Sequence, residues 1–174
     1  IIVIYFSGHG TETHELVLYD TDRNDLTNTT IPLETLTEWF SKIPAKKVIC
    51  ILDCCFSGGM GAKVFQTGIQ SKNLKSTDDL IKELSGDSKI VYAACLGTEE
   101  AWENQKIGHG YLTYYLIQAL LGADEVKEAD KIDLYKLFGF VTKKVKDSVA
   151  SIGKTQTPTL TGRIEGELKW PIFQ

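Results

Sequence analysis

The chain has no basic excess and no long apolar run, and each absence excludes a class of protein. Its 19 lysine and arginine residues are outnumbered by 23 aspartate and glutamate residues, for a net charge of −4. The sequence therefore has no basic stripe of the kind that would indicate nucleic-acid binding. No apolar stretch approaches the ~20 residues of a membrane-spanning helix. We expect a protein that contacts neither nucleic acid nor membrane directly.

Cysteine is also scarce, since the 174 residues hold only four. This is too few for a disulfide scaffold, and a disulfide between the adjacent Cys54 and Cys55 would be strained. The three histidines, at positions 9, 14 and 109, are scattered and do not pair with cysteines at zinc-site spacing. We expect no metal, no cofactor and a reducing, cytoplasmic compartment, with Cys50 and Cys95 as core residues.

What is present is typical of one globular domain over residues 1–174, with 43% hydrophobic and 24% charged residues and no internal repeat. Buried-strand patterns alternate with helical patterns, which predicts an α/β domain with a mostly parallel sheet. The opening run is expected to be a strand buried on both faces, and Thr30 is expected to cap the first helix, with Pro32 in its first turn. The predicted strands are 1–6, 14–19, 46–55 and 89–95, with one or two edge-type strands in 157–173. The predicted helices are 31–43, 76–84, 111–121 and 133–150.

Two of these strands end in chemically capable residues. The first ends in Ser7-Gly8-His9-Gly10 and the second in Asp53-Cys54-Cys55. A right-handed crossover through the helix between them would bring both carboxyl ends to the same edge of the sheet. There an imidazole could raise the thiolate fraction of a cysteine and protonate a leaving group. Topology alone weighs this reading evenly against a buried thiol and a simple turn histidine.

Side-chain alternation separates the two neighbouring cysteines. Cys54 shares one face with Val48, Cys50 and Leu52, whereas Asp53 shares the other with Ile49 and Ile51. We therefore expect Cys54 in the core and Cys55 exposed beyond the strand end. His109, in a loop before a helix, is expected to be structural or peripheral, and His14 to face solvent.

The sequence resembles the caspase-like cysteine peptidases, and most closely their prokaryotic orthocaspase and metacaspase branch. The resemblance rests on "IIVIYFSGHG", "VICILDCCFSGG", "VYAACLGTEEAWE" and "GHGYLTYYLIQALLG", in this order, and runs from residue 1 to about residue 170. It implies a three-layer α/β/α sandwich. The first two strands and first helix of the family are missing, so we expect this chain to be an N-terminally incomplete domain.

The resemblance also implies roles for individual residues. His9 and Cys55 match the family's catalytic dyad, and the backbone amides of Gly10 and Cys55 match its oxyanion hole. Asp53 stands where animal caspases have a pocket glutamine, and Glu103 falls at or near a pocket arginine. An acidic pocket favours a cationic side chain. We expect cleavage after Arg or Lys, with substrate contacts from Ser7, Asp53, Glu99, Glu100, Trp102 and Glu103.

The resulting hypothesis is a cysteine endopeptidase, regulated and active in signalling, stress or defence, that acts on protein substrates. The alternative is a caspase-fold interaction module without useful activity, in a larger assembly with further domains or subunits. A cysteine phosphatase is set aside, because it needs an arginine six residues after its nucleophile and Gly61 stands there.

Two loops carry further expectations. The acidic residues Asp20, Asp22 and Asp25 invite a calcium site, but their spacing is not that of an EF-hand, so we expect a solvated turn. Residues 58–77 form a long loop in the region where family members cleave themselves. Its basic residues would suit the expected specificity, although a loop that is merely flexible explains it equally well; they are Lys63, Lys72 and Lys75.

Overall fold

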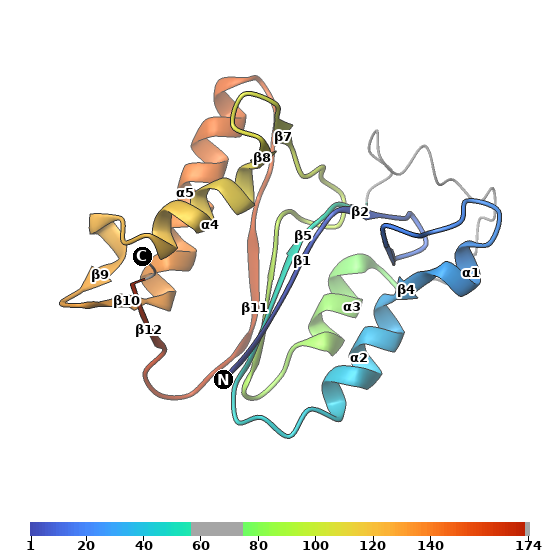
Figure 1. The fold of residues 1–174 in the computed structure, drawn as a ribbon, viewed down its shortest axis with the longest axis horizontal. Helices are drawn as coiled ribbons and strands as arrows, with labels where there is room; N and C mark the ends of the chain where they lie inside the picture. Colours follow the sequence, from blue (N-terminus) through green and yellow to red (C-terminus); the bar gives the residue numbers. More distant parts are fainter. Residues whose placement is uncertain (57–74, 173–174) are drawn as a thin grey trace.

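The computed structural model describes residues 1–56 and 75–172 of the chain. Its main sheet has four strands in the order β1-β5-β6-β11 (Figure 1). The first three strands run parallel, and β11 runs antiparallel to β6. The sheet is therefore mostly parallel, as the sequence predicts. The strands are β1 (Ile2–Ser7), β5 (Val48–Asp53), β6 (Lys89–Ala93) and β11 (Thr159–Arg163).

Helices cover both faces of this sheet (Figure 1). One layer contains α2 (Leu33–Ser41) and α3 (Thr77–Leu84), and the other contains α4 (Tyr111–Leu120) and α5 (Leu134–Ser151). The buried residues form two clusters, one for each layer. Strand β5 contributes alternate residues to each, which confirms the predicted alternation and the three-layer sandwich.

The N-termini of two helices follow the expected capping chemistry. Ser76 accepts a hydrogen bond from the backbone of Asp79 at the start of α3, and Asp133 does the same for α5. The prediction for α2 is wrong, because Thr30 lies in strand β4 (Thr30–Pro32) and α2 begins after Pro32. The Thr30 hydroxyl donates to the carbonyl oxygen of Leu26 in α1 (Leu26–Thr29), so it is engaged before α2 begins.

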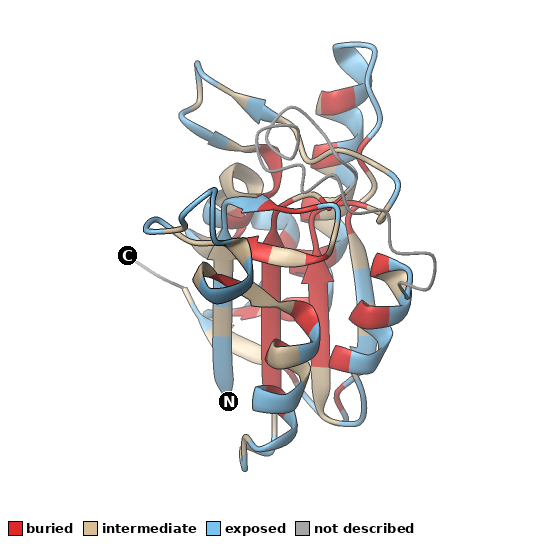
Figure 2. Cartoon of the chain, turned by 90° about the vertical axis from the view of Figure 1, so that its right-hand side faces the viewer, coloured by how far each residue is buried: buried red, intermediate tan, exposed pale blue. Residues whose placement is uncertain are grey.

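Strand β1 corrects a second expectation. It was predicted to be buried on both faces, but it lies at the edge of the main sheet. Val3 and Tyr5 are each 46% exposed, while Ile4 and Phe6 pack against the core on the side of α2 and α3. Figure 2 shows the contrast between this pale strand and the buried strands beside it. An unbroken apolar run therefore did not distinguish an edge strand from a central one.

Short strands build the surroundings of the carboxyl edge. Strands β2 (His9–Gly10) and β3 (Glu15–Val17) form a small sheet with β4, and β7 (Glu103–Asn104) pairs with β8 (His109–Gly110).

A third small sheet follows η2 (Asp124–Val126) and contains β9 (Lys127–Glu128), β10 (Lys131–Asp133) and β12 (Lys169–Pro171). None of the helices within 1–56 and 75–172 has the length and apolar character needed to span a bilayer.

Most of the loop in which self-cleavage was expected lies outside the described residues, including Lys63 and Lys72. Lys75 is described, and its ammonium group lies 2.7 Å from the Glu83 carboxylate.

Candidate active site

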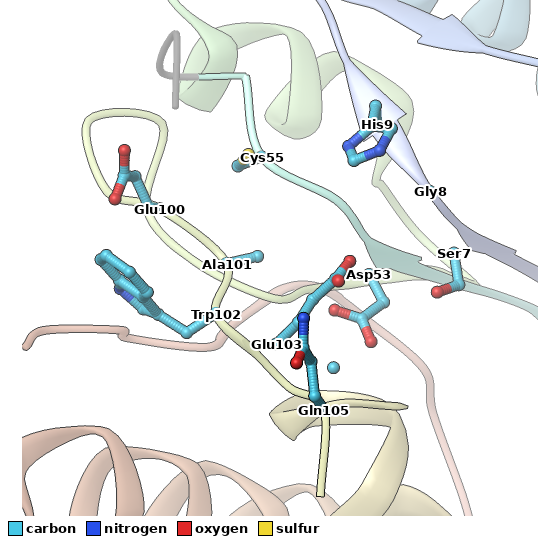
Figure 3. Close-up of a pocket in the computed structure, with 11 residues that line it drawn as sticks. Ser7, Gly8, His9, Asp53, Cys55, Glu100, Ala101, Trp102, Glu103 and Gln105 are labelled. Atoms are coloured by element: carbon cyan, nitrogen blue, oxygen red, sulfur yellow. The ribbon is translucent and has the colours of Figure 1, made fainter. Parts of the chain in front are cut away.

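The tips of β1 and β5 are level, as the crossover argument predicts. Ser7 pairs with Asp53 in the parallel register, and the Gly8 amide donates to the Asp53 carbonyl oxygen at 3.1 Å. The residues that follow, His9 and Cys55, line one cavity of about 320 Å³ (Figure 3). The structure therefore brings an imidazole and a thiol, 46 positions apart in sequence, to the same cavity.

Cys55 differs from its neighbour as the alternation argument predicts. Cys54 is 4% exposed and packs in the core on the side of α2 and α3. Cys55 follows the end of β5, is partly exposed and lines the cavity. Within the described parts of the chain, no hydrogen bond joins its thiol to His9. Hydrogen bonds between catalytic residues are commonly long in the absence of substrate and shorten when substrate binds.

The surroundings of Cys55 favour the protonated thiol. Burial raises the pKa of Cys55, and the carboxylates of Glu100 and Glu103 raise it further. A backbone hydrogen bond from Ala101 acts in the opposite direction and lowers the pKa. The net effect is a thiol whose pKa lies above its ordinary value. Its thiolate, the nucleophilic form, is therefore scarce at neutral pH in the unliganded protein.

This protonation state can be tested without any substrate. Because only the thiolate reacts, the rate at which iodoacetamide alkylates Cys55 should be low at pH 7 and increase with pH. The midpoint of this increase should lie at a pH above the ordinary thiol pKa of about 8.5. Glu100→Gln removes a nearby negative charge, so it should move the midpoint to lower pH and speed the reaction at pH 7. Mass spectrometry of the Cys55 peptide measures the rate, and the other three cysteines are buried.

Glu125→Gln is the matched control, because it removes a charge from an exposed position in η2, outside the cavity lining. An unchanged midpoint in Glu100→Gln, or an equal change in both variants, would contradict this account of the electrostatics around the thiol.

The turn that carries His9 lies against the backbone that carries Cys55. A Cβ on Gly10 would come within 2.6 Å of the Cys55 carbonyl oxygen and of the Phe56 ring, so only glycine permits this approach. The Thr11 amide donates across the β2–β3 ladder to Glu15. Since amides alternate in direction along a strand, the Gly10 amide points away from β3. Gly10 and Cys55 therefore lie against one another, although Gly10 is buried and absent from the cavity lining, and their role as oxyanion-hole donors stays a prediction.

Asp53 forms the floor beside this thiol. It is 6% exposed and lines the cavity, with Ser7 and Glu103 flanking it (Figure 3). Burial raises the pKa of its carboxyl group, and the nearby Glu103 also raises it. The Thr113 hydroxyl and amide both donate to its Oδ2 and lower the pKa. A buried carboxylate is costly unless it is hydrogen-bonded, and these two bonds serve that purpose.

The segment from Glu100 to Gln105, which includes β7, forms the opposite wall. Glu100, Trp102 and Glu103 line the cavity, and their contact with substrate stays a prediction. Gln105 also lines it, although the sequence offered no signal for this residue. Trp102 is fixed by its amide, which donates to the Gln156 side chain at 2.9 Å. Among the described residues, no lysine or arginine lines the cavity, whereas three acidic residues do, namely Asp53, Glu100 and Glu103.

Glu99 is the expected substrate residue that the structure does not place with the others. Its carboxylate accepts hydrogen bonds from the Thr157 amide, at 2.6 Å, and from the Thr157 hydroxyl, at 3.0 Å. It is absent from the cavity lining. This arrangement ties the segment before β7 to the segment before β11, which is a structural role.

The two remaining histidines differ from one another. The expectation that His14 faces solvent is wrong, since it is 8% exposed and its ring lies 6.3 Å from that of Phe56. Burial lowers its pKa. His109 lies outside the lining of the main cavity, in an adjoining cavity of about 410 Å³ that shares Ser7 and Glu103 with it. This is a peripheral position, as predicted.

The carboxylates of the acidic loop accept hydrogen bonds from within the loop itself and from the helix that follows. Asp22 accepts from the Asn24 backbone at 2.8 Å, and Asp25 accepts from the Asn28 amide group at 2.8 Å. Across residues 1–56 and 75–172, no three histidine, cysteine or acidic side chains are grouped in a way that could hold a metal ion.

Comparisons with known proteins agree with this geometry. A family model described as the caspase domain matches residues 1–168. Among solved structures, caspase-1 from Spodoptera frugiperda is similar, with a TM-score of 0.56 at 15% sequence identity, which indicates a shared fold. The match covers 95% of this chain and 61% of that caspase chain, so this chain spans about three fifths of its length. A comparison with curated proteins found no match.

Proposed function

We propose, from the premise that this chain belongs to the caspase-domain family, that it is a cysteine endopeptidase that cleaves after arginine or lysine. One observation carries the proposal. The Cys55 thiol and the His9 imidazole share a cavity with the buried Asp53 carboxylate, at the carboxyl edge of the sheet. This combination supplies a nucleophile, an acid–base group and a counter-charge for a substrate cation.

The chemistry follows the acyl-transfer pattern. The Cys55 thiol gives its proton to His9, and its sulfur forms a bond to the scissile carbonyl carbon. The oxyanion that results is stabilised by backbone amides, for which Gly10 and Cys55 are the candidates. As the carbon–nitrogen bond breaks, His9 returns the proton to the leaving amine. Water then attacks the thioester while His9 accepts its proton. As the carbon–sulfur bond breaks, His9 gives that proton to the Cys55 sulfur, and the new carboxyl terminus is released.

The preference for a basic P1 residue, the one before the cleaved bond, rests on charge. Asp53 and Glu103 bring two negative charges to the cavity, and the Ser7 hydroxyl lies beside them. A cationic side chain is stabilised between them, whereas an aspartate side chain would be repelled and desolvated. A regulated role in signalling, stress or defence, further domains or subunits and a cytoplasmic location are predictions from the family resemblance.

A cleavage profile tests the proposal. A peptide library with all residues at P1 should be cut after arginine and lysine, and hardly at all after aspartate. Cleavage after aspartate would overturn the specificity. A folded protein that cuts no member of the library would favour the interaction module instead.

A further inference from the structure

The carboxylate of Asp53 is held by a chain of two side chains from other elements. The Thr113 hydroxyl, in the first turn of α4, donates to Asp53 Oδ2, and the Thr113 amide donates to the same oxygen at 3.1 Å. The Tyr5 hydroxyl, from β1, lies 2.6 Å from the Thr113 hydroxyl oxygen. One carboxylate oxygen is thus joined to both a helix N-terminus and the edge strand.

These two side chains supply hydrogen bonds to the Asp53 carboxylate and also fix its orientation. Both bonds from Thr113 go to Oδ2, which leaves Oδ1 as the oxygen for a ligand in the cavity. Gly110 closes the side of the carboxylate, since a Cβ there would come within 2.8 Å of Oδ2. The carboxylate therefore has little freedom to turn. Fixed geometry of this kind is what a selective site requires of the residues behind it.

We propose that Thr113, supported by Tyr5, is a positioning residue that sets the preference for a basic P1 side chain by fixing the Asp53 carboxylate. The inference rests on the proposed function. Thr113 acts through Asp53 and has no place in the bond-making steps. Nothing in the sequence pattern singled out either residue, because a threonine in an apolar helix and a tyrosine in an apolar strand look like ordinary core positions.

The electrostatic balance around Asp53 depends on Thr113. Burial and the Glu103 charge on β7 favour the protonated carboxyl group, while Thr113 on α4 and His109 on β8 favour the carboxylate. Asp53 in turn raises the pKa of two buried thiols, those of Cys54 and Cys95. Losing the Thr113 hydroxyl removes one of the few interactions that favour the charged carboxylate.

The test compares Thr113→Val, which loses the hydroxyl and keeps the shape, with Thr113→Ser, which keeps the hydroxyl. Each variant is assayed on two peptides that differ only at P1, one with arginine and one with its neutral isostere citrulline. In Thr113→Val, kcat/KM for the arginine peptide should fall roughly 10- to 100-fold, mainly through KM, with little change for the citrulline peptide. Thr113→Ser should keep the wild-type ratio, and Tyr5→Phe should lie between.

The pH profile gives a second readout. A carboxylate must be ionised to bind the cation, so activity on the arginine peptide falls as pH drops through the pKa of Asp53. Removing a bond that lowers this pKa should move the acid limb of kcat/KM to higher pH in Thr113→Val and leave it in place in Thr113→Ser. A merely structural role would lower kcat on both peptides without moving the limb.

The ratio of the two peptides is measured on one sample, so it is independent of the fraction of protein that folds. A wild-type arginine-to-citrulline ratio and acid limb in Thr113→Val would overturn the positioning role alone. A wild-type enzyme with no preference for arginine over citrulline would instead overturn the proposed specificity, and this inference with it.

Discussion

Replacement of Cys55 by alanine is expected to abolish turnover, with a fall in kcat of about a thousandfold or more. The reason is chemical, because alanine has no nucleophile and no acyl-enzyme can form. The adjacent Cys54→Ala is the matched control. Cys54 is buried in the core, so its loss removes one sulfur from the packing and should leave most of the activity intact. Steady-state kinetics on an arginine peptide measures both variants.

This pair of variants separates the two cysteines cleanly. An inactive Cys54→Ala beside an active Cys55→Ala would exchange their roles and contradict the alternation argument. Melting temperatures should be recorded for both, since Cys54→Ala is the variant expected to lose stability and Cys55→Ala should melt close to the wild type.

Asp53→Asn is the second change with a large expected effect. Asparagine keeps the shape of the side chain and removes its charge, so a cationic P1 side chain loses a buried partner. The loss should amount to about 2–5 kcal/mol in transition-state binding of arginine and lysine peptides. The citrulline peptide should be affected far less. Values of kcat/KM for the three peptides give the result directly.

The control for this charge change is Asp130→Asn, which removes a carboxylate from the exposed loop between β9 and β10, outside the cavity lining. It should leave all three peptides unchanged. If Asp53→Asn reduced the citrulline and arginine peptides equally, Asp53 would be only a support for the N-terminus of α4 and the basic specificity would need another source.

The geometry of the candidate dyad could be predicted because it depends on short-range rules. Alternation along β5 separates Cys54 from Cys55, and a crossover between two parallel strands brings their ends to one edge. Both rules need only the residues within and between the two strands. Ser7 pairs with Asp53 in the parallel register, so the residues that follow the two strands begin at the same edge of the sheet.

The surroundings of the dyad could not be predicted in the same way, since they depend on contacts between distant segments. Gln105 reaches the cavity because β7 and β8 pair, and the sequence has no strong signal for such short strands. Likewise, Tyr5 and Thr113 are 108 positions apart and meet only in the folded chain. His14 looked polar in a local alternation, yet it is buried and its ring lies near that of Phe56.

The most direct test of the central claim is covalent labelling by an arginine- or lysine-based acyloxymethylketone, followed by mass spectrometry of the modified peptide. The cation of this reagent should bind in the acidic cavity beside the thiol, and the imidazole should assist the attack of the sulfur. We predict one adduct, on Cys55, that is greatly slowed in His9→Ala and in Asp53→Asn. An adduct on another cysteine, or no adduct on a protein shown to be folded, would contradict the shared cavity as a catalytic site.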